Sequence, residues 1–197
     1  ELGDTVLVDS ILARVRREHT VWPLDWLQRN VSTARWHSIV REAAASPALH
    51  AVLMIYTHMY SARGVLDDAA TSTVFSTVAR SVAVRLQEDS AYDAETRREL
   101  VHAVTSYAVR QTDTSLIPAL IPLVAGDSAT YAATTNALLL LTAADSVPGS
   151  PRSTAAERRA AQRFWERWWS ERGAAFVLPP RAAGDAAASR WWRRASR

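Results

Sequence analysis

The chain has 197 residues, of which 48% are hydrophobic and 22% are charged, so it is long enough and apolar enough to bury one substantial core. It contains no cysteine, which excludes disulfides, thiolate zinc sites and cysteine nucleophiles, and no lysine, which excludes Schiff-base and P-loop chemistry. The formal net charge of +3 is unevenly distributed, because residues 1–150 carry 12 arginines against 16 acidic residues whereas residues 151–197 carry 11 against 4.

Helical spacing of apolar residues dominates the first part of the chain. A first helix is predicted over residues 4–18. Residues 20–30 are predicted to be a linker with one short helical turn, because Pro23 interrupts them. A Ser-Thr pair then begins a helix that covers residues 32–45. No window alternates with the period of two that marks a strand, so the chain is predicted to be all-α.

The next segment is a candidate membrane span. Residues 43–62 contain no Asp, Glu or Arg, and 20 residues are about the length that crosses a bilayer. However, Ser46-Pro47 is typical of an N-cap followed by proline at the first helical position, which leaves only ~16 residues for the helix. His50 and His58 also lie within it. The better interpretation is a buried central helix, since its apolar residues cover most of its faces.

Two long helices are predicted in the middle of the chain, each begun by an aspartate. One begins at Asp67 or Asp68 and ends near residue 86, and the other is capped by Asp93 and ends near Arg110. Asp67 and Asp68 are also a carboxylate pair. Because adjacent residues point to different sides of a helix, capping is a better interpretation of the pair than acid–base catalysis.

The most informative segment is residues 113–144, DTSLIPALIPLVAGDSATYAATTNALLLLTAA. It predicts two short apolar helices, the first capped by Asp113 and bent at Pro122, joined by a tight turn at Gly126-Asp127. A pair of this kind cannot bury both of its faces alone and needs similar pairs beside it. The segment therefore favours a helical-repeat scaffold over a catalytic pocket.

The same segment resembles a HEAT repeat. Residues 115–124, SLIPALIPLV, are similar to the first helix of that repeat, whose typical form is close to aIPaLIpLL. The Gly-Asp-Ser at residues 126–128 matches its polar turn, and Ala137-Leu138 matches its second helix. Where many such repeats have Val-Arg after the turn, this chain has Thr130-Tyr131, so the resemblance does not carry over the usual Asp–Arg ladder.

The segment that follows resembles the end of bacterial HEAT-repeat proteins. There a helix ending in LTG leads through a Pro/Gly loop to a helix with tryptophans, as LTAADSVPGSP leads here to RFWERWWSERGAAF. The resemblance covers residues 113–172, and over residues 33–111 it is limited to helix pairs of plausible length. It implies an all-α, right-handed stack of helix pairs.

Aromatic residues form a stripe on the last predicted helix. Phe164, Trp165, Trp168 and Trp169 share one side of it. One interpretation is that the stripe closes the open end of the stack, as terminal repeats must. The alternative is that Trp165, Trp168 and Trp169 bind a partner or a ligand.

A basic aromatic tail follows an Ala/Gly/Pro-rich linker at residues 178–188. Its predicted partner-binding residues are Arg190, Trp191, Trp192, Arg193 and Arg194. Tryptophans flanked by arginines suit a groove on a partner protein, a membrane interface or a nucleic-acid backbone. The tail can equally fold back on the surface of its own chain.

Catalytic and metal motifs are absent from the sequence. It lacks G-x-S-x-G, G-x-G-x-x-G and H-E-x-x-H. His50, Met54 and His58 share one helical side and are possible ligand types for a metal or haem, but no carboxylate or cysteine on that helix completes a set. Histidines bonded to carbonyl groups are the favoured interpretation, and no metal, cofactor or small-molecule substrate is predicted.

These patterns predict a HEAT-like helical-repeat domain over residues 1–173, with the linker and tail over residues 174–197. The expected function is that of a non-catalytic scaffold or accessory subunit that binds a protein partner within a larger complex, with membrane association as one setting. Two alternatives stay open. One is a nucleic-acid-binding, glycosylase-like HEAT protein, against which the acidic balance of residues 1–150 argues; the other is peripheral attachment to an anionic membrane through the tail.

The first residue bears on location. The chain begins with Glu1, and initiator methionine is normally removed only before small residues. We therefore expect a cleaved precursor or a fragment. An exported, periplasmic or membrane-associated location is favoured over a cytoplasmic one.

Overall fold

The computed structural model describes residues 2–18, 21–59, 69–88, 92–144, 150 and 152–177. Within these residues it contains nine α-helices, four 3₁₀ helices and no strand, which confirms the predicted all-α class. The elements in chain order are α1 (Leu2–Glu18), α2 (Trp22–Asn30), α3 (Thr33–Ala44), η1 (Pro47–Leu49), α4 (His50–Met59), α5 (Ala69–Arg85), α6 (Ala94–Gln111), η2 (Thr114–Leu116), α7 (Ile117–Leu120), η3 (Ile121–Ala125), α8 (Ser128–Thr142), α9 (Ala155–Arg172) and η4 (Gly173–Ala175).

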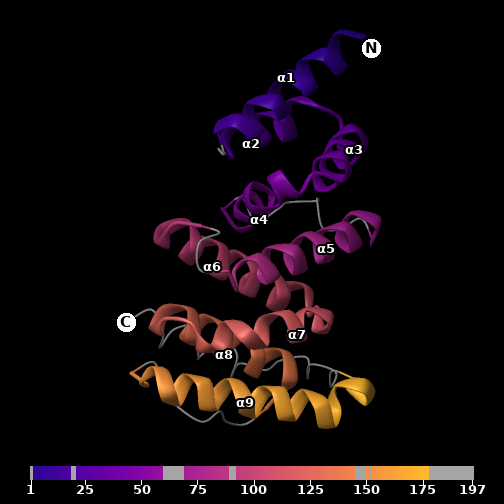
Figure 1. The fold of residues 1–197 in the computed structure, drawn as a ribbon. Coiled ribbons are helices and arrows are strands. Elements are labelled where there is room, and N and C mark those ends of the chain that lie inside the picture. Colours follow the sequence, from indigo (N-terminus) through magenta and orange to yellow (C-terminus); the bar gives the residue numbers. More distant parts are fainter. Residues whose placement is uncertain are drawn as a thin grey trace.

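The helices are stacked in two columns that run from α1 at one end to α9 at the other (Figure 1). In one column α3 packs on α5, α5 packs on η2 and α7, and η3 packs on α9. In the other column α4 packs on α6, and α6 packs on α8. Contacts between consecutive helices join the columns. Helices in each column therefore bury apolar surface against one another, while the division into repeated helix pairs and the HEAT assignment stay predictions.

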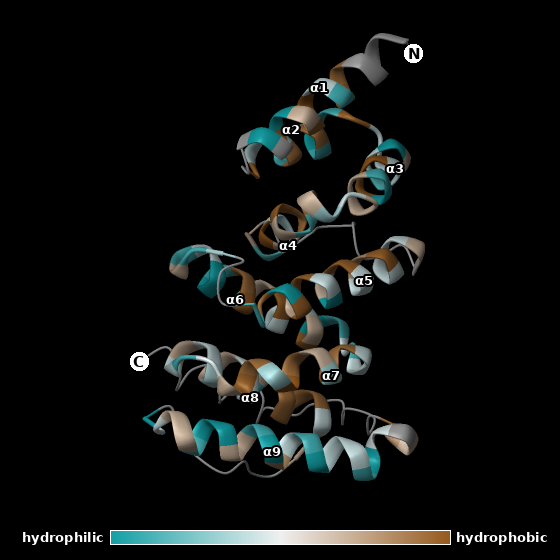
Figure 2. Cartoon of the chain, in the orientation of Figure 1, coloured by the Kyte–Doolittle hydropathy of each residue, from teal (hydrophilic) through white to brown (hydrophobic). Residues whose placement is uncertain are grey.

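One hydrophobic core runs along the contact between the columns. Its largest fully buried side chains include Tyr56, Phe75, Tyr107, Tyr131 and Trp165. Figure 2 shows hydrophobic residues concentrated on η3 and α8, whereas the visible face of α9 is largely hydrophilic. The helix α9 at the end of the stack is thus amphipathic, with its apolar side turned toward η3.

Short polar side chains begin several helices as the sequence predicts. Ser32 accepts a hydrogen bond from the backbone N–H of Arg35 at the start of α3. Asp93 accepts from Thr96 at the start of α6, at 2.9 Å. These side chains satisfy backbone donors that have no partner inside the helix. The predicted starts of α3 and α6 are confirmed.

The linker predicted for residues 20–30 is wrong, because this segment forms the helix α2. Pro23 lies in the first turn of α2, where a backbone N–H has no partner within the helix, so the missing donor costs nothing there. Leu24 and Leu27 are buried beneath it. Proline therefore begins this helix instead of interrupting it.

The first member of the predicted helix pair at residues 113–144 is broken into three short pieces. Pro118 lies at the start of α7 and Pro122 at the start of η3, so each proline begins a new segment. Gly126 then closes the turn, and a Cβ atom there would lie only 2.8 Å from Cγ2 of Thr130. The bend predicted at Pro122 and the tight turn at Gly126-Asp127 are both confirmed.

The segment weighed as a membrane span forms a short central helix. Among the residues that the structure describes, no helix is both long and apolar enough to cross a bilayer. A 3₁₀ turn, η1, precedes the ten residues of α4, which packs against α5 and α6. Tyr56 of α4 donates a hydrogen bond to Gln28 of α2. The interpretation as a buried central helix is confirmed.

Candidate functional site

The aromatic stripe of α9 packs inward against η3. A capping box of Thr154 and Glu157 begins the helix. Trp165 is fully buried and Trp168 is 9% exposed, and their ring centroids are 5.9 Å apart in an edge-to-face arrangement. Phe176, beyond the helix, adds a second edge-to-face contact to Trp168 at 5.4 Å. Edge-to-face rings are favourable beyond the area that they bury.

The end of α9 is shaped by this stripe. Trp169 stacks on Trp168, and Gly173 lies so close that a Cβ atom on it would be 2.5 Å from the Cε2 atom of Trp169. The guanidinium of Arg172 lies over the ring of Trp168. The stripe thus covers the last described helix layer. Partner binding through Trp165, Trp168 and Trp169 stays a prediction, and the buried ring of Trp165 offers no surface of its own.

The other predicted partner-binding residues belong to the basic tail. They are Arg190, Trp191, Trp192, Arg193 and Arg194, and they lie outside the described residues. Asp67 and Asp68 lie outside them as well.

Exposed tryptophans occur instead on α2. Trp22 is 60% exposed and Trp26 is 37% exposed, and their spacing of four residues places them on one side of the helix. The guanidinium of Arg14 in α1 lies 6.0 Å from the centroid of the Trp22 ring. Asp25 and Arg29 form an ion pair beside them at 3.1 Å. We call Trp22, Trp26 and Arg14 the α2 face.

Sequence reasoning missed the α2 face because it assigned this segment to a linker. The signal was present in the spacing of its residues. Leu24 and Leu27 bury one side of the helix, so tryptophans at positions 22 and 26 must lie on another. The tryptophans of α9, in contrast to those of α2, lie mainly on the buried side of their helix.

The histidines of α4 occupy two different environments. His50 is buried, and its Nε2 lies 2.8 Å from the carbonyl oxygen of Ala44, which confirms the interpretation as a carbonyl-bonded histidine for this residue. His58 stacks on His102 of α6, with ring centroids 5.6 Å apart. Burial, and then the nearby charges of His102 and Arg110, lower the pKa of His58. The described residues contain no cluster of three or more metal-ligating side chains.

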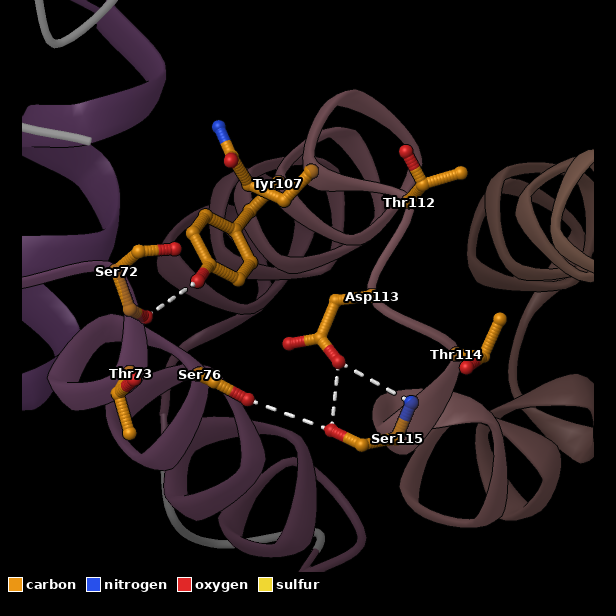
Figure 3. Close-up of a pocket in the computed structure, with 9 residues that line it drawn as sticks. Ser72, Thr73, Ser76, Tyr107, Thr112, Asp113, Thr114 and Ser115 are labelled. Atoms are coloured by element: carbon orange, nitrogen blue, oxygen red, sulfur yellow. Dashed lines mark hydrogen bonds between the residues drawn. The ribbon is translucent and has the colours of Figure 1, made fainter. Parts of the chain in front are cut away.

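A polar pocket of about 380 Å³ lies where the start of α5 meets the end of α6 and the turn into η2 (Figure 3). Its lining side chains are hydroxyl, amide or carboxyl groups: Ser72, Thr73, Ser76, Tyr107, Gln111, Thr112, Asp113, Thr114 and Ser115. The backbone of Thr112 is left-handed, with φ of 54°, as it ends α6 and turns the chain into the pocket. We call this the Asp113 pocket.

Hydrogen bonds fix the walls of the Asp113 pocket. Oδ1 of Asp113 accepts from the backbone N–H of Ser115 at 3.1 Å and from its hydroxyl at 2.6 Å, which makes Asp113 the predicted cap. The hydroxyl of Tyr107 donates to the carbonyl oxygen of Ser72 at 3.1 Å. Burial and the charge of Asp113 raise the pKa of Tyr107 to about 12, although the bond to Ser72 acts in the other direction. The phenol is therefore protonated at neutral pH.

The sequence predicts Asp113 as a helix cap but does not predict this pocket. Its members come from segments about 35 residues apart, so no local pattern connects them. The available signal was the run of hydroxyl and carboxyl side chains at residues 112–115.

Comparison with known proteins adds no assignment to this geometry. The chain matches no protein family model, no curated protein and no solved structure. The features that bear on function are therefore the α2 face, the α9 helix and the Asp113 pocket.

Proposed function

We propose that the chain is a non-catalytic scaffold or accessory subunit that binds a protein partner within a larger complex. The observation that carries this proposal is the exposure of Trp22 and Trp26 on the α2 face, with Arg14 beside them. Tryptophan and arginine are the residue types that dominate the binding energy of protein interfaces. The basic tail is the second predicted contact, with the partner or with an anionic membrane beside it.

The size of the effect favours a protein partner over an incidental surface feature. Covering the exposed parts of two tryptophan rings removes roughly 200 Å² of mainly apolar surface from water, which is worth on the order of 5 kcal/mol before the costs of association. The rings are held on a helix whose other side is buried, so their backbone does not have to become ordered on binding.

A second candidate function is binding of a polyanion such as a nucleic-acid backbone. Arg159, Arg163 and Arg167 follow one another at intervals of four residues, and all three are exposed on α9. They belong to the part of the chain with an excess of arginine. A row of exposed guanidinium groups supplies the electrostatic contact that phosphates require.

The test compares three variants of the full chain, each isolated untagged from its native source. The double substitution Trp22→Ser/Trp26→Ser removes the α2 face, deletion of residues 185–197 removes most of the tail, and Val84→Ser is the matched control at another exposed apolar position, which is 49% exposed. We expect the double variant to lose a stoichiometric protein partner, measured by light scattering after gel filtration, while Val84→Ser retains it.

Two outcomes count against the proposal. Retention of the partner by the double variant would remove the α2 face from the interface. Isolation of the chain with nucleic acid alone, released steeply by salt and lost in the triple substitution Arg159→Gln/Arg163→Gln/Arg167→Gln, would favour the second function.

A further inference from the structure

The Asp113 pocket has an unusual charge balance. Asp113 supplies the one carboxyl group among the lining residues, since the other lining side chains are hydroxyls and one amide, and the phenol of Tyr107 remains protonated at neutral pH. No arginine or histidine lines the pocket. Arg80 contacts the same turn through the carbonyl oxygen of Ser115, but it is not part of the wall. The pocket therefore carries one negative charge with no cation inside it.

One oxygen of Asp113 is available for a ligand. Both hydrogen bonds of this carboxylate go to Oδ1, from the backbone and the hydroxyl of Ser115. No hydrogen bond from another described residue reaches Oδ2, and Figure 3 shows this oxygen directed into the space between Tyr107 and Ser76. A carboxylate oxygen that faces a pocket and accepts from no protein donor can pair with a ligand that brings donors with it.

The hydroxyl and carbonyl groups near Oδ2 can accept hydrogen bonds from a ligand. The hydroxyl of Ser76 lies 3.4 Å from that of Ser115, and either can act as the donor in that contact. The carbonyl oxygen of Ser72 accepts from Tyr107 and retains a second lone pair. An anion would be repelled by Asp113. A neutral polyol would displace water from the pocket and leave the negative charge of Asp113 without a counter-charge. The chemistry that remains is a cation with several donors.

We propose that the Asp113 pocket binds the guanidinium group of an arginine side chain that a partner protein presents. A guanidinium carries five donors in one plane, pairs with carboxylates by charge-assisted hydrogen bonds and is more weakly hydrated than an ammonium. The pocket volume of about 380 Å³ is at the lower end of ligand sites and accommodates one side chain. Because the arginine is supplied by a protein, this assignment rests on the proposed function.

The experiment uses the full chain and a defined probe, so that it does not depend on isolating the partner. Nα-acetyl-L-argininamide is titrated into ¹⁵N-labelled protein, and the amide shifts of residues 112–115 are followed by NMR. Nα-acetyl-L-citrullinamide, which has the same shape without the charge, is the ligand control. A Gly-Gly-Arg-Gly-Gly peptide and agmatine distinguish a protein-borne guanidinium from a free small molecule, with tighter binding of the peptide expected.

The variants separate the charge from the fold. Asp113→Asn removes the charge but keeps an N-cap oxygen for Ser115, and Asp127→Asn makes the same change at the cap of α8, outside the pocket. We expect saturable binding of the arginine probe that is at least about tenfold weaker in Asp113→Asn, at least about tenfold weaker for citrullinamide, and unchanged in Asp127→Asn. Absent or non-saturable binding, equal binding of citrullinamide, unaltered binding to Asp113→Asn or tighter binding of agmatine than of the peptide would overturn the assignment.

The failure of this assignment is distinguishable from the failure of the proposed function. Trp22→Ser/Trp26→Ser changes the α2 face and leaves the Asp113 pocket intact, so it is expected to bind the arginine probe as the parent chain does. A chain that binds its partner through the α2 face but shows no saturable probe binding would contradict the pocket alone.

Discussion

Carboxylates at helix starts are the residues whose charge the fold uses most directly. Backbone hydrogen bonds lower the pKa of three of them: the bond from Thr96 acts on Asp93, that from Thr130 on Asp127 and that from Thr154 on Glu157. Each bond favours the ionised form in the folded chain. The stability that they contribute is therefore present above the pKa of the unfolded chain and is lost as the pH falls through the folded value.

Replacement of Asp127 tests this contribution at the turn that precedes α8. Asp127→Ala leaves the backbone N–H of Thr130 without its acceptor, so the free energy of unfolding should fall by about 1 kcal/mol at pH 7. Urea denaturation at pH 7 and at pH 3 measures the difference from the parent chain. The loss should shrink at pH 3, because Asp127 of the unfolded chain binds a proton before that of the folded chain and the stability given by the ionised cap is then being lost. Asp127→Asn should retain most of the cap at both pH values. An equal loss at both would contradict the role of the charge.

The stacked histidines predict a second pH dependence of stability, this time from a base whose charged form is disfavoured in the folded chain. Because burial, His102 and Arg110 lower the pKa of His58, the unfolded chain binds a proton at this residue before the folded chain does. Above about pH 6.5 both forms are neutral and the residue contributes nothing. Below that value the free energy of unfolding should fall until the folded His58 also binds its proton.

His58→Gln removes this titration and should flatten the pH dependence of stability between about pH 5 and 7. Urea midpoints of the parent chain and the variant measure it, and His37→Gln is a matched control, since His37 lies on α3 outside the stacked pair. A parent midpoint that stays constant across this range would show that His58 is not penalised when it is charged.

The caps could be predicted from the sequence, because the side chain and its backbone donor are two or three residues apart. Asp93 and Asp113 were predicted as caps in this way and are confirmed. The stacking of His58 on His102 and the closure of the Asp113 pocket by Ser72 could not be predicted. They depend on how α5 and α6 are placed in space, which no local pattern specifies.

At the scale of elements, α9 and α2 show how position in the stack decides what a tryptophan does. Both helices carry tryptophans at a spacing of four or fewer residues. Those of α9 face η3 and are largely buried, whereas those of α2 point away from Leu24 and Leu27. The aromatic stripe on α9 could be predicted from the sequence. Which tryptophans would pack against a neighbouring element could not.

Trp165 is the residue on which the packing of α9 depends most. Trp165→Ala should lower the free energy of unfolding by about 3–5 kcal/mol, because it removes a large, fully buried side chain and leaves a cavity in its place. Its indole N–H is buried without a hydrogen-bond partner, so Trp165→Phe should cost much less than Trp165→Ala. Urea denaturation measures both, with Trp169→Ala as the partly exposed comparison. Similar losses at Trp165 and Trp169 would contradict the claim that the packing of α9 depends most on Trp165.

For the prolines, the effect predicted from the sequence can be compared with the structure. Pro122 was predicted to bend a helix and Pro23 to interrupt a linker; the bend is confirmed, whereas the linker is wrong. Both prolines lie in the first turn of the segment that they begin, where the missing N–H removes no hydrogen bond. Where a short helix begins depends on the tertiary contacts that stabilise it, such as those of Leu24 and Leu27.

At the scale of the whole molecule, the two columns of helices leave different surfaces at the two ends of the stack (Figure 1). The α1–α2 end exposes tryptophans beside Arg14, and the α9 end exposes the row of Arg159, Arg163 and Arg167. A stack of this form can hold two partners of different chemistry apart. The all-α class and most helix positions were predictable from apolar spacing, but the division of surfaces between the ends follows from the packing alone.

Contact between the α2 face and a protein partner can be measured by amide hydrogen exchange. Exchange is compared between the isolated chain and the chain in its purified native complex. If the α2 face lies in the interface, the added protection in the complex is strongest at residues 22–30 and in the part of α1 that carries Arg14. Added protection elsewhere with residues 22–30 unchanged would exclude the α2 face from the interface.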